Sequence, residues 1–174
     1  MRMRTVLPLD AGSAIVDAAL AAGRAEAMHP LTVVVLDVGG RMVACKSEDG
    51  SGTLRFDVAR GKAAGALGMG ISSRLIRDRL KDRVAFQAAL AAAAGGQFVP
   101  VPGGVLILDA DGYTIGAVGI SGDTSEKDEY CAIRAIHAAG YASEPAEIDP
   151  DWTRSYLSDA DRSRSEDDRA ERSS

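Results

Sequence analysis

Residues 98–136, FVPVPGGVLILDADGYTIGAVGISGDTSEKDEYCAIRAI, carry the pattern that decides the fold. Two apolar runs, 105–108 and 113–121, flank the turn dipeptide Asp111-Gly112, which predicts a β-hairpin. Asp123, with Glu126 three residues later, predicts the capped start of a helix that runs to about Gly140. The stretch therefore predicts two strands that lead through small residues into a helix. A ligand could bind where that small-residue exit meets the helix N-terminus.

The first half of the chain has the same organisation. A helix is predicted from about Asp10 to Ala27, with Asp10 as its cap, followed by strands at 31–36 and 41–46 around the turn Asp37-Val38-Gly39-Gly40. Further helices are predicted over 53–68, from Ser72 or Ser73 to Leu80, and over 81–94. Two similar hairpins would join into one antiparallel sheet covered by helices, which is an α+β layered domain.

Glycines recur along the helix predicted over 53–68. Gly61, Gly65 and Gly68 are spaced by four and three residues. Each costs about 1 kcal/mol relative to alanine inside a helix, so we expect a structural reason for them. The close approach of another backbone, from a neighbouring helix or a subunit partner, is the prediction.

Size and composition restrict the class of protein. The 174 residues fit a single domain, predicted over 1–148, with an extension over 149–174 that is expected to be disordered from about residue 158. The net charge of −5 argues against nucleic-acid binding. The chain shows no apolar run typical of a signal peptide or membrane span, which predicts a cytoplasmic protein without a membrane partner. Cys45 and Cys131 are predicted to be free thiols.

Few residues could carry chemistry. His29 and His137 are the only imidazoles; His29 is either a partly exposed loop residue or a catalytic or ligating group, and His137 favours a helix C-terminus. Arg55 and Lys62 lie seven residues apart on one side of the predicted helix. They either extend their charged ends to solvent or form a cationic wall for a carboxylate.

The acidic residues after the second hairpin leave two interpretations open. Asp123, Glu126, Asp128 and Glu129 cap the positive end of a helix, which makes an external phosphate an improbable ligand. Alternatively, Glu126 and Glu129 share a helix face as an E-x-x-E pair that could bind a cation, with His29 as a further metal candidate.

Four motifs in this order resemble the GlcG-like family, also called haem-degrading or haem-binding, which includes HbpS-type proteins and the C-terminal domain of PduO-type adenosyltransferases. The motifs are VVVLDVGGRMVA (33–44), the helix around 59–63, PGGVLI (102–107) and IGAVGISGDTSEKDE (115–129). The resemblance spans about Asp10 to Gly140. It implies a profilin-like three-layer α/β/α sandwich with a central five-stranded antiparallel sheet, and homo-oligomers from dimers to octamers. Residues that match the family's positions are Lys62, Gly103, Gly104, Gly119, Gly122 and Asp128.

Three functions follow as hypotheses. The first is a cytosolic, oligomeric protein that binds haem, or a related planar molecule with carboxylates. Its predicted ligand-binding residues are Arg55, Lys62, Gly103, Gly104, Gly119, Ser121 and Gly122. The second is an enzyme acting on an organic acid in an aromatic or glycolate catabolic pathway, with Lys62, Asp128 and His29 as candidate catalytic residues. The third is a non-catalytic scaffold or regulatory domain.

Overall fold

The computed structural model of the chain describes residues 6–158 and 161–162. The tail from about residue 158, for which the sequence predicts disorder, lies mostly outside the described residues. The helices and strands follow one another along the chain in the order α1 (Leu9–Ala25), β1 (Thr32–Asp37), β2 (Met42–Ser47), α2 (Arg55–Met69), α3 (Ser73–Leu80), α4 (Val84–Ala93), β3 (Gly104–Leu108), β4 (Thr114–Ser121), α5 (Ser125–Ala138), β5 (Ala142–Glu144) and the 3-10 helix η1 (Trp152–Arg154).

The five strands form one antiparallel sheet in the order β2-β1-β4-β3-β5. The two strands of each hairpin pair with each other, and β1 pairs with β4 to join the two hairpins, as the sequence predicts. In the register, Val34 of β1 lies opposite Gly119 of β4, and Gly119 lies opposite Gly104 of β3. Gly104 and Gly119 thus form a glycine row across β3 and β4, beside Val34 of the first hairpin.

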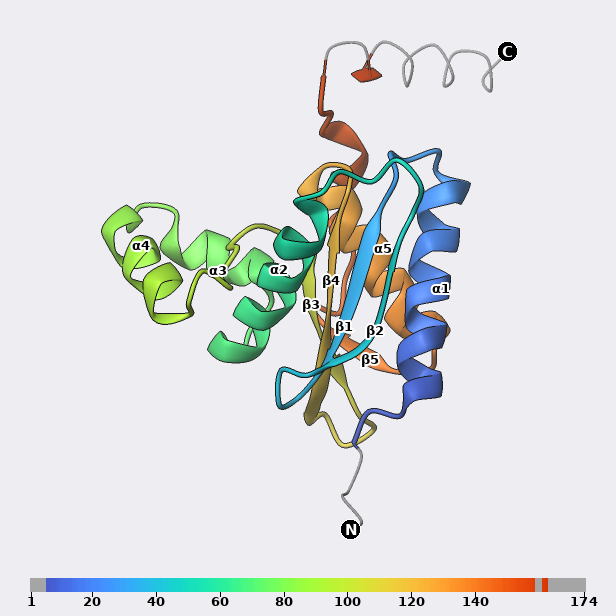
Figure 1. Ribbon diagram of the computed structural model, residues 1–174, viewed down its shortest axis with the longest axis horizontal. Helices are drawn as coiled ribbons and strands as arrows, with labels where there is room; N and C mark the ends of the chain where they lie inside the picture. The colour runs from blue at the N-terminus through green and yellow to red at the C-terminus, as the bar shows by residue number, and fades with distance from the viewer. Residues whose placement is uncertain (1–5, 159–160, 163–174) are drawn as a thin grey trace.

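Helices cover both faces of the sheet, so the α+β sandwich that the resemblance implies is confirmed (Figure 1). Alternate strand residues point to opposite faces. The core between the sheet and the helices α1 and α5 includes Ile15, Val16, Leu20, Val33, Val35, Val105, Ile107, Val118, Ile120, Ile133 and Ile136. The core under α2 is built from Val34, Leu36, Ala59, Ala63, Ala66, Leu106 and Ala117.

Helix α2 lies very close to the sheet because small residues face each other. A Cβ atom on Gly119 would overlap the carbonyl oxygen of Ala59, and one on Gly104 would overlap the carbonyl oxygen of Lys62. The alanines of α2 thus rest directly on the glycine row of β3 and β4.

Two of the three glycines of α2, Gly61 and Gly65, pack against a segment of the same chain rather than against a neighbouring helix. A Cβ on Gly61 would lie 2.7 Å from Val99 Cγ2, and one on Gly65 would lie 3.3 Å from the ring of Phe98. Both neighbours belong to the extended segment before β3. Gly68 has nothing within 4 Å of its Cβ position.

Two predicted helix caps are wrong. The N-cap of α1 is Pro8, and Asp10 lies in the first turn without capping it. The N-cap of α5 is Thr124, with no side-chain hydrogen bond. Asp123 instead accepts a hydrogen bond from the backbone N–H of His29 and pairs with Lys127, so its carboxylate serves tertiary contacts.

The C-terminal segment continues along α5. The ring of Trp152 stacks on that of Tyr130 in α5, with centroids 3.9 Å apart and planes 13° apart. Ser155 Oγ donates a hydrogen bond to Glu126, which lies in the first turn of the same helix. Among the described residues, no helix combines the length and the apolar character that crossing a membrane requires.

Candidate functional site

The candidate site lies at one end of the sheet, where β3 begins and β4 ends. Here α2 and α5, which cover opposite faces, approach each other past the ends of the strands. Lys62 Nζ of α2 donates a hydrogen bond of 2.7 Å to Asp128 Oδ2 of α5. The two side chains are only 2% and 1% exposed. An ion pair is therefore fully buried between the two helical layers.

The surroundings of Asp128 are unfavourable for its charge. Burial raises the pKa of its carboxyl to about 6, although the ammonium of Lys62 and the hydrogen bond from the backbone N–H of Asp123 act in the opposite direction. Removal from water costs an ion several kcal/mol, and only good geometry offsets this cost. Asp128 therefore has the properties of a group that could exchange a proton near neutral pH.

Gly103 completes this arrangement. Its φ of +109° favours glycine, and a Cβ there would lie 2.9 Å from Lys62 Nζ and 3.0 Å from Asp128 Cβ. A side chain at position 103 would thus crowd both partners, and Lys62 Nζ would have to shift. The PGG motif therefore contributes a residue that lies directly against the ion pair.

Arg55 and Ser121 meet at the same end of the sheet. Arg55 Nη1 donates to Ser121 Oγ over 3.3 Å in a partly buried contact. The structure therefore gathers Arg55, Lys62, Gly103 and Ser121, which come from three separate parts of the chain. Of the predicted cationic wall, Arg55 is partly exposed, whereas Lys62 is enclosed.

The remaining glycines of the predicted ligand site contact protein backbone. Gly104 and Gly119 lie against α2, and a Cβ on Gly122 would overlap the carbonyl oxygen of Pro30. Their lack of side chains is thus used for close packing in this conformation. The pocket predicted between these glycines and Lys62 stays a prediction, and it requires α2 to move away from β4.

The E-x-x-E pair contacts arginines. Arg74 Nε donates to Glu129 Oε1 over 2.7 Å, and Arg77 Nη1 donates to Glu126 Oε1 over 3.3 Å. Burial raises the pKa of Glu129, and its Oε2 has no hydrogen-bond partner. No group of three or more metal-ligating side chains occurs within residues 6–158 and 161–162.

His29 lies on the linker between α1 and β1. Its backbone N–H donates to Asp123 Oδ2 over 2.9 Å, and its Nε2 lies 3.3 Å from Asp161 Oδ1. The ring is 44% exposed. His29 is thus connected to Asp128 through Asp123, whose carboxylate accepts the backbone N–H of His29 and whose own backbone N–H donates to Asp128, whereas the imidazole of His29 is partly exposed. The other imidazole, His137 Nε2, is hydrogen-bonded to Ser143 Oγ at 2.9 Å.

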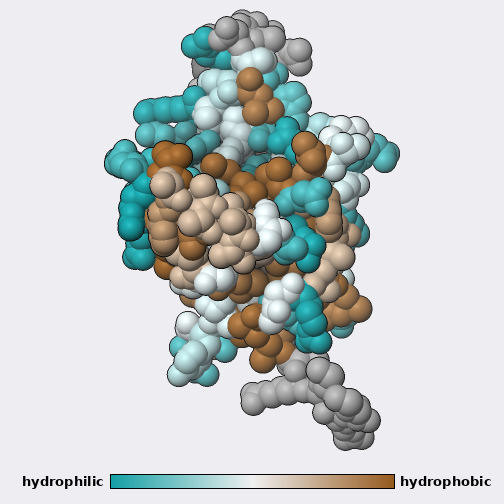
Figure 2. Space-filling view, turned by 60° about the vertical axis from the view of Figure 1, so that its left-hand side comes forward, coloured by the Kyte–Doolittle hydropathy of each residue, from teal (hydrophilic) through white to brown (hydrophobic). Residues whose placement is uncertain are grey.

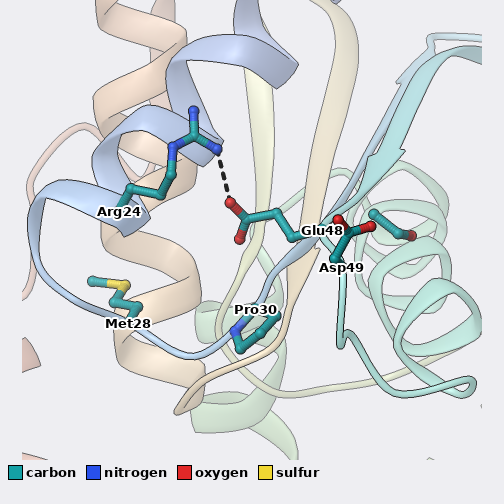
Figure 3. Close-up of a pocket in the computed structure, with 6 residues that line it drawn as sticks. Arg24, Met28, Pro30, Glu48 and Asp49 are labelled. Atoms are coloured by element: carbon teal, nitrogen blue, oxygen red, sulfur yellow. Dashed lines mark hydrogen bonds and ion pairs between the residues drawn. The ribbon is translucent and has the colours of Figure 1, made fainter.

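A surface pocket that was not predicted from the sequence lies beside the linker that carries His29, and it is lined by the neighbours Met28 and Pro30 rather than by His29 itself. Figure 3 shows Arg24 at the end of α1, with its guanidinium bonded to Glu48 beyond β2, and the side chains of Met28 and Pro30 on the linker. The lining is completed by Ser47 and Asp49. These residues lie far apart in sequence, and only the antiparallel pairing of β1 and β2 brings them together. No short motif signals such a pocket.

Both cysteines are free, as predicted. Cys131 is buried, with its Sγ 3.5 Å from Met28 Sδ, and burial raises the pKa of its thiol. A thiol in these surroundings is not activated as a nucleophile.

The general class of this protein is an α+β sandwich with an antiparallel sheet, and a charged pair is enclosed at one end of that sheet. The particular family follows from comparison with known proteins. The chain belongs to the family described as haem degrading protein HbpS-like, whose model matches residues 7–137. The resemblance seen in the sequence is thereby confirmed.

Solved structures agree with this fold. A PduOC:heme complex is 23% identical, with a TM-score of 0.69 over 79% of this chain and 98% of that chain. The Klebsiella pneumoniae protein ORFY is 21% identical, with a TM-score of 0.70 over 80% and 94%. A double mutant of Streptomyces reticuli HbpS is 23% identical, with a TM-score of 0.66 over 79% and 90%. At these identities the likeness shows the fold alone. A search of curated proteins gave no significant match.

Proposed function

We propose that this chain is a cytoplasmic, homo-oligomeric protein that binds haem or a related planar molecule bearing carboxylates. The observation that carries the proposal is its membership of the HbpS-like haem-degrading family over residues 7–137. The fold likeness to a PduOC:heme complex supports it.

The described residues fit a haem bound at the surface better than one enclosed in the core. The glycines near Lys62 leave no space beside α2, and the pocket at Arg24 is open and mostly polar. His29, whose ring is 44% exposed, would hold the iron, while Arg24 or Arg55 would pair with a carboxylate. Haem, when bound, supplies an iron that an imidazole can ligate.

A haem titration with matched histidine variants tests the proposal. We expect a Soret shift at micromolar haem for the wild type and for His137→Ala, and a shift that is lost or at least tenfold weaker for His29→Ala. Far-UV circular dichroism confirms that both variants are folded. A wild type without a Soret shift would remove the haem proposal, and an unchanged His29→Ala would remove only the role of His29.

A second function is favoured by one specific observation. The carboxyl of Asp128 has its pKa raised to about 6, which suits a general base near neutral pH, and the ammonium of Lys62 lies 2.7 Å from it. In an enzyme acting on an organic acid, Lys62 would bind the substrate carboxylate and Asp128 would accept a proton. Because both groups are buried, substrate entry would require α2 and α5 to separate at this end of the sheet.

Turnover of candidate organic acids tests this second function. Asp128→Asn should abolish turnover, and Lys62→Ala should raise KM for a carboxylate substrate more than for its amide. The wild-type kcat/KM should rise with pH through about 6, where Asp128 loses its proton. Turnover that is unchanged in both variants would remove this hypothesis.

A further inference from the structure

Helix α4 is an apolar element without a core of its own. Its sequence, VAFQAALAAA, contains no charged residue and only one polar one, Gln87. None of its residues is buried, and Val84 and Phe86 are 74% and 40% exposed. The helix projects from the α2 side of the sandwich (Figure 1), and Figure 2 shows tan and brown side chains gathered on this face.

The described part of the chain covers α4 on one side only. Leu90 and Ala91 pack against a small cluster formed by Ile76, Leu80 and Phe98. Exposed residues lie on the remaining surface of the helix: Val84, Ala85, Phe86, Ala88, Ala89, Ala92 and Ala93. A helix that is apolar all round normally lies in a protein interior. Something outside the described residues should therefore cover this surface.

The two ends of the chain carry too many charged side chains to cover this surface of α4. The last twelve residues, SRSEDDRAERSS, contain a single apolar side chain, Ala170, and in the first five, MRMRT, each methionine is followed by an arginine. Burying such segments against α4 would desolvate charges without partners. The covering surface must itself be uncharged and apolar, and α4 of another copy has this chemistry.

We propose that α4 is a contact surface between two copies of this chain and packs antiparallel on α4 of the second copy. This inference rests on the proposed homo-oligomer and is independent of the proposed haem binding. It assigns the assembly to a particular element and orientation.

The charges around α4 favour the antiparallel orientation. Arg79, Lys81 and Arg83 precede the helix and outnumber the one acidic residue among them, Asp82, and only Ala94 follows the helix before Gly95. In an antiparallel pair the basic end of each helix lies beside the C-terminal end of the other, whose free carbonyl groups attract cations. A parallel pair would place both basic ends together. Alanines on the exposed face allow the two helices to approach closely.

The contact should be weak when it acts alone. A ten-residue helix is about 15 Å long and about 10 Å across, so half of its surface offers roughly 250 Å² per copy. Stable interfaces bury about 800 Å² per partner. We therefore expect an assembly that dissociates on dilution.

Sedimentation velocity with a matched pair of variants tests the surface. Ala88→Glu places two like charges across the two-fold axis, whereas Ala21→Glu makes the same change at an exposed alanine inside α1. We expect the particle mass to fall by a factor of at least two for Ala88→Glu and to stay unchanged for Ala21→Glu. A wild type that is monomeric at all concentrations overturns both the proposed oligomer and this surface. An oligomeric wild type with an unchanged Ala88→Glu variant overturns the surface alone.

Disulfide cross-linking tests the orientation. In the antiparallel pair, position 85 of one copy lies near position 92 of the other. Oxidation of a mixture of Ala85→Cys and Ala92→Cys proteins should therefore yield a covalent dimer, while neither variant alone should exceed the wild-type background from Cys45 and Cys131. A dimer from Ala85→Cys alone would indicate parallel packing and overturn the proposal, as would the absence of any covalent dimer. The Soret titration of Ala88→Glu should match the wild type, which separates this result from haem binding.

Discussion

The buried pair between Lys62 and Asp128 is the most costly arrangement at the scale of single residues. Both charges are almost fully removed from water, and their attraction must offset the loss of hydration. The pKa of Asp128, raised to about 6, indicates that desolvation outweighs the attraction of Lys62 for this carboxyl. Retaining a charged pair at such a position is consistent with a functional role for it.

Removing one partner of this pair should therefore lower the stability of the protein strongly. We expect Lys62→Met to lower the free energy of unfolding at pH 7 by about 3–5 kcal/mol, because Asp128 would remain buried without a cation. Urea denaturation followed by circular dichroism measures this change. The matched control is Lys46→Met, which breaks an exposed pair with Asp17 and should cost less than about 1 kcal/mol. Equal effects in the two variants would contradict the burial argument.

The raised pKa of Asp128 also predicts a pH dependence. In the window between its ordinary value of 3.8 and about 6, the folded protein holds a proton that the unfolded chain releases. Stability from this group is therefore greatest below pH 3.8 and is lost as pH rises through about 6, by ~3 kcal/mol in total. Relative to Asp128→Asn, the wild type should lose stability over this window in urea titrations. A constant difference between the two proteins would show that Asp128 does not titrate there.

Single residues could be selected from the sequence, but their partners could not. Lys62 and Asp128 both match family positions, yet the bond between them spans 66 residues and depends on two helices from opposite faces of the sheet. The sequence predicts Asp123 as a helix cap because capping is a local pattern. Its contact with the backbone of His29 depends on the path of a distant linker. The pocket at Arg24 escaped prediction for the same reason.

At the scale of elements, the glycine row under α2 controls how closely a helix approaches the sheet. The backbone of α2 lies directly against those of β3 and β4 at Gly104 and Gly119, with no side chain between them. There is no space for a methyl group at the glycines of this row, whereas there is space for one on the outer side of α2.

Two glycine-to-alanine substitutions separate these situations. We expect Gly119→Ala to destabilise the protein by at least about 2 kcal/mol, because its Cβ would overlap the carbonyl oxygen of Ala59. Gly68→Ala meets nothing within 4 Å and should stabilise the protein by about 0.5–1 kcal/mol through helix propensity. Thermal unfolding of both variants measures the contrast. A stable Gly119→Ala protein would mean that α2 lies further from β4.

Most elements could be predicted from periodicity and turn residues, with ends that differ by a few residues. The strand β5 has only three residues, too few for a period-two pattern to be distinguished from a loop. The predicted close approach of another backbone is confirmed for Gly61 and Gly65 and is wrong for Gly68. The identity of the neighbour, the segment at Phe98 and Val99, depends on the crossing from α4 to β3 and could not be read from local sequence.

At the scale of the whole molecule, the C-terminal segment extends beyond the family match, which ends at residue 137. The PduOC:heme complex is covered over 98% of its length, while about a fifth of this chain has no counterpart in it. The segment is attached to α5 by the stack of Trp152 on Tyr130 and by the bond from Ser155 to Glu126.

The stack should contribute measurably to stability. We expect Trp152→Ala to lower the free energy of unfolding by about 1–2 kcal/mol, because an aromatic pair and its buried area are lost. Tyr113→Ala, at an exposed aromatic residue of the β3–β4 turn, should change it by less than about 0.5 kcal/mol. Chemical denaturation distinguishes the two. An unaffected Trp152→Ala protein would indicate that the segment is held by its other contacts.

The layered fold was predictable because two hairpins with the same pattern can share a sheet, and the resemblance supplied the five-stranded topology. The projection of α4 from the sandwich was not predictable, because its sequence pattern differs little from that of a core helix. Only the placement of the neighbouring elements decides which apolar helix stays outside.

The position of the Lys62–Asp128 pair also bears on how the molecule opens. The pair joins the helical layer on one face of the sheet to the helical layer on the other, so neither layer can detach without exposing an ion whose partner stays behind in a low-dielectric interior. Fraying confined to one face is penalised for this reason. The two layers are therefore coupled into a single cooperative unit.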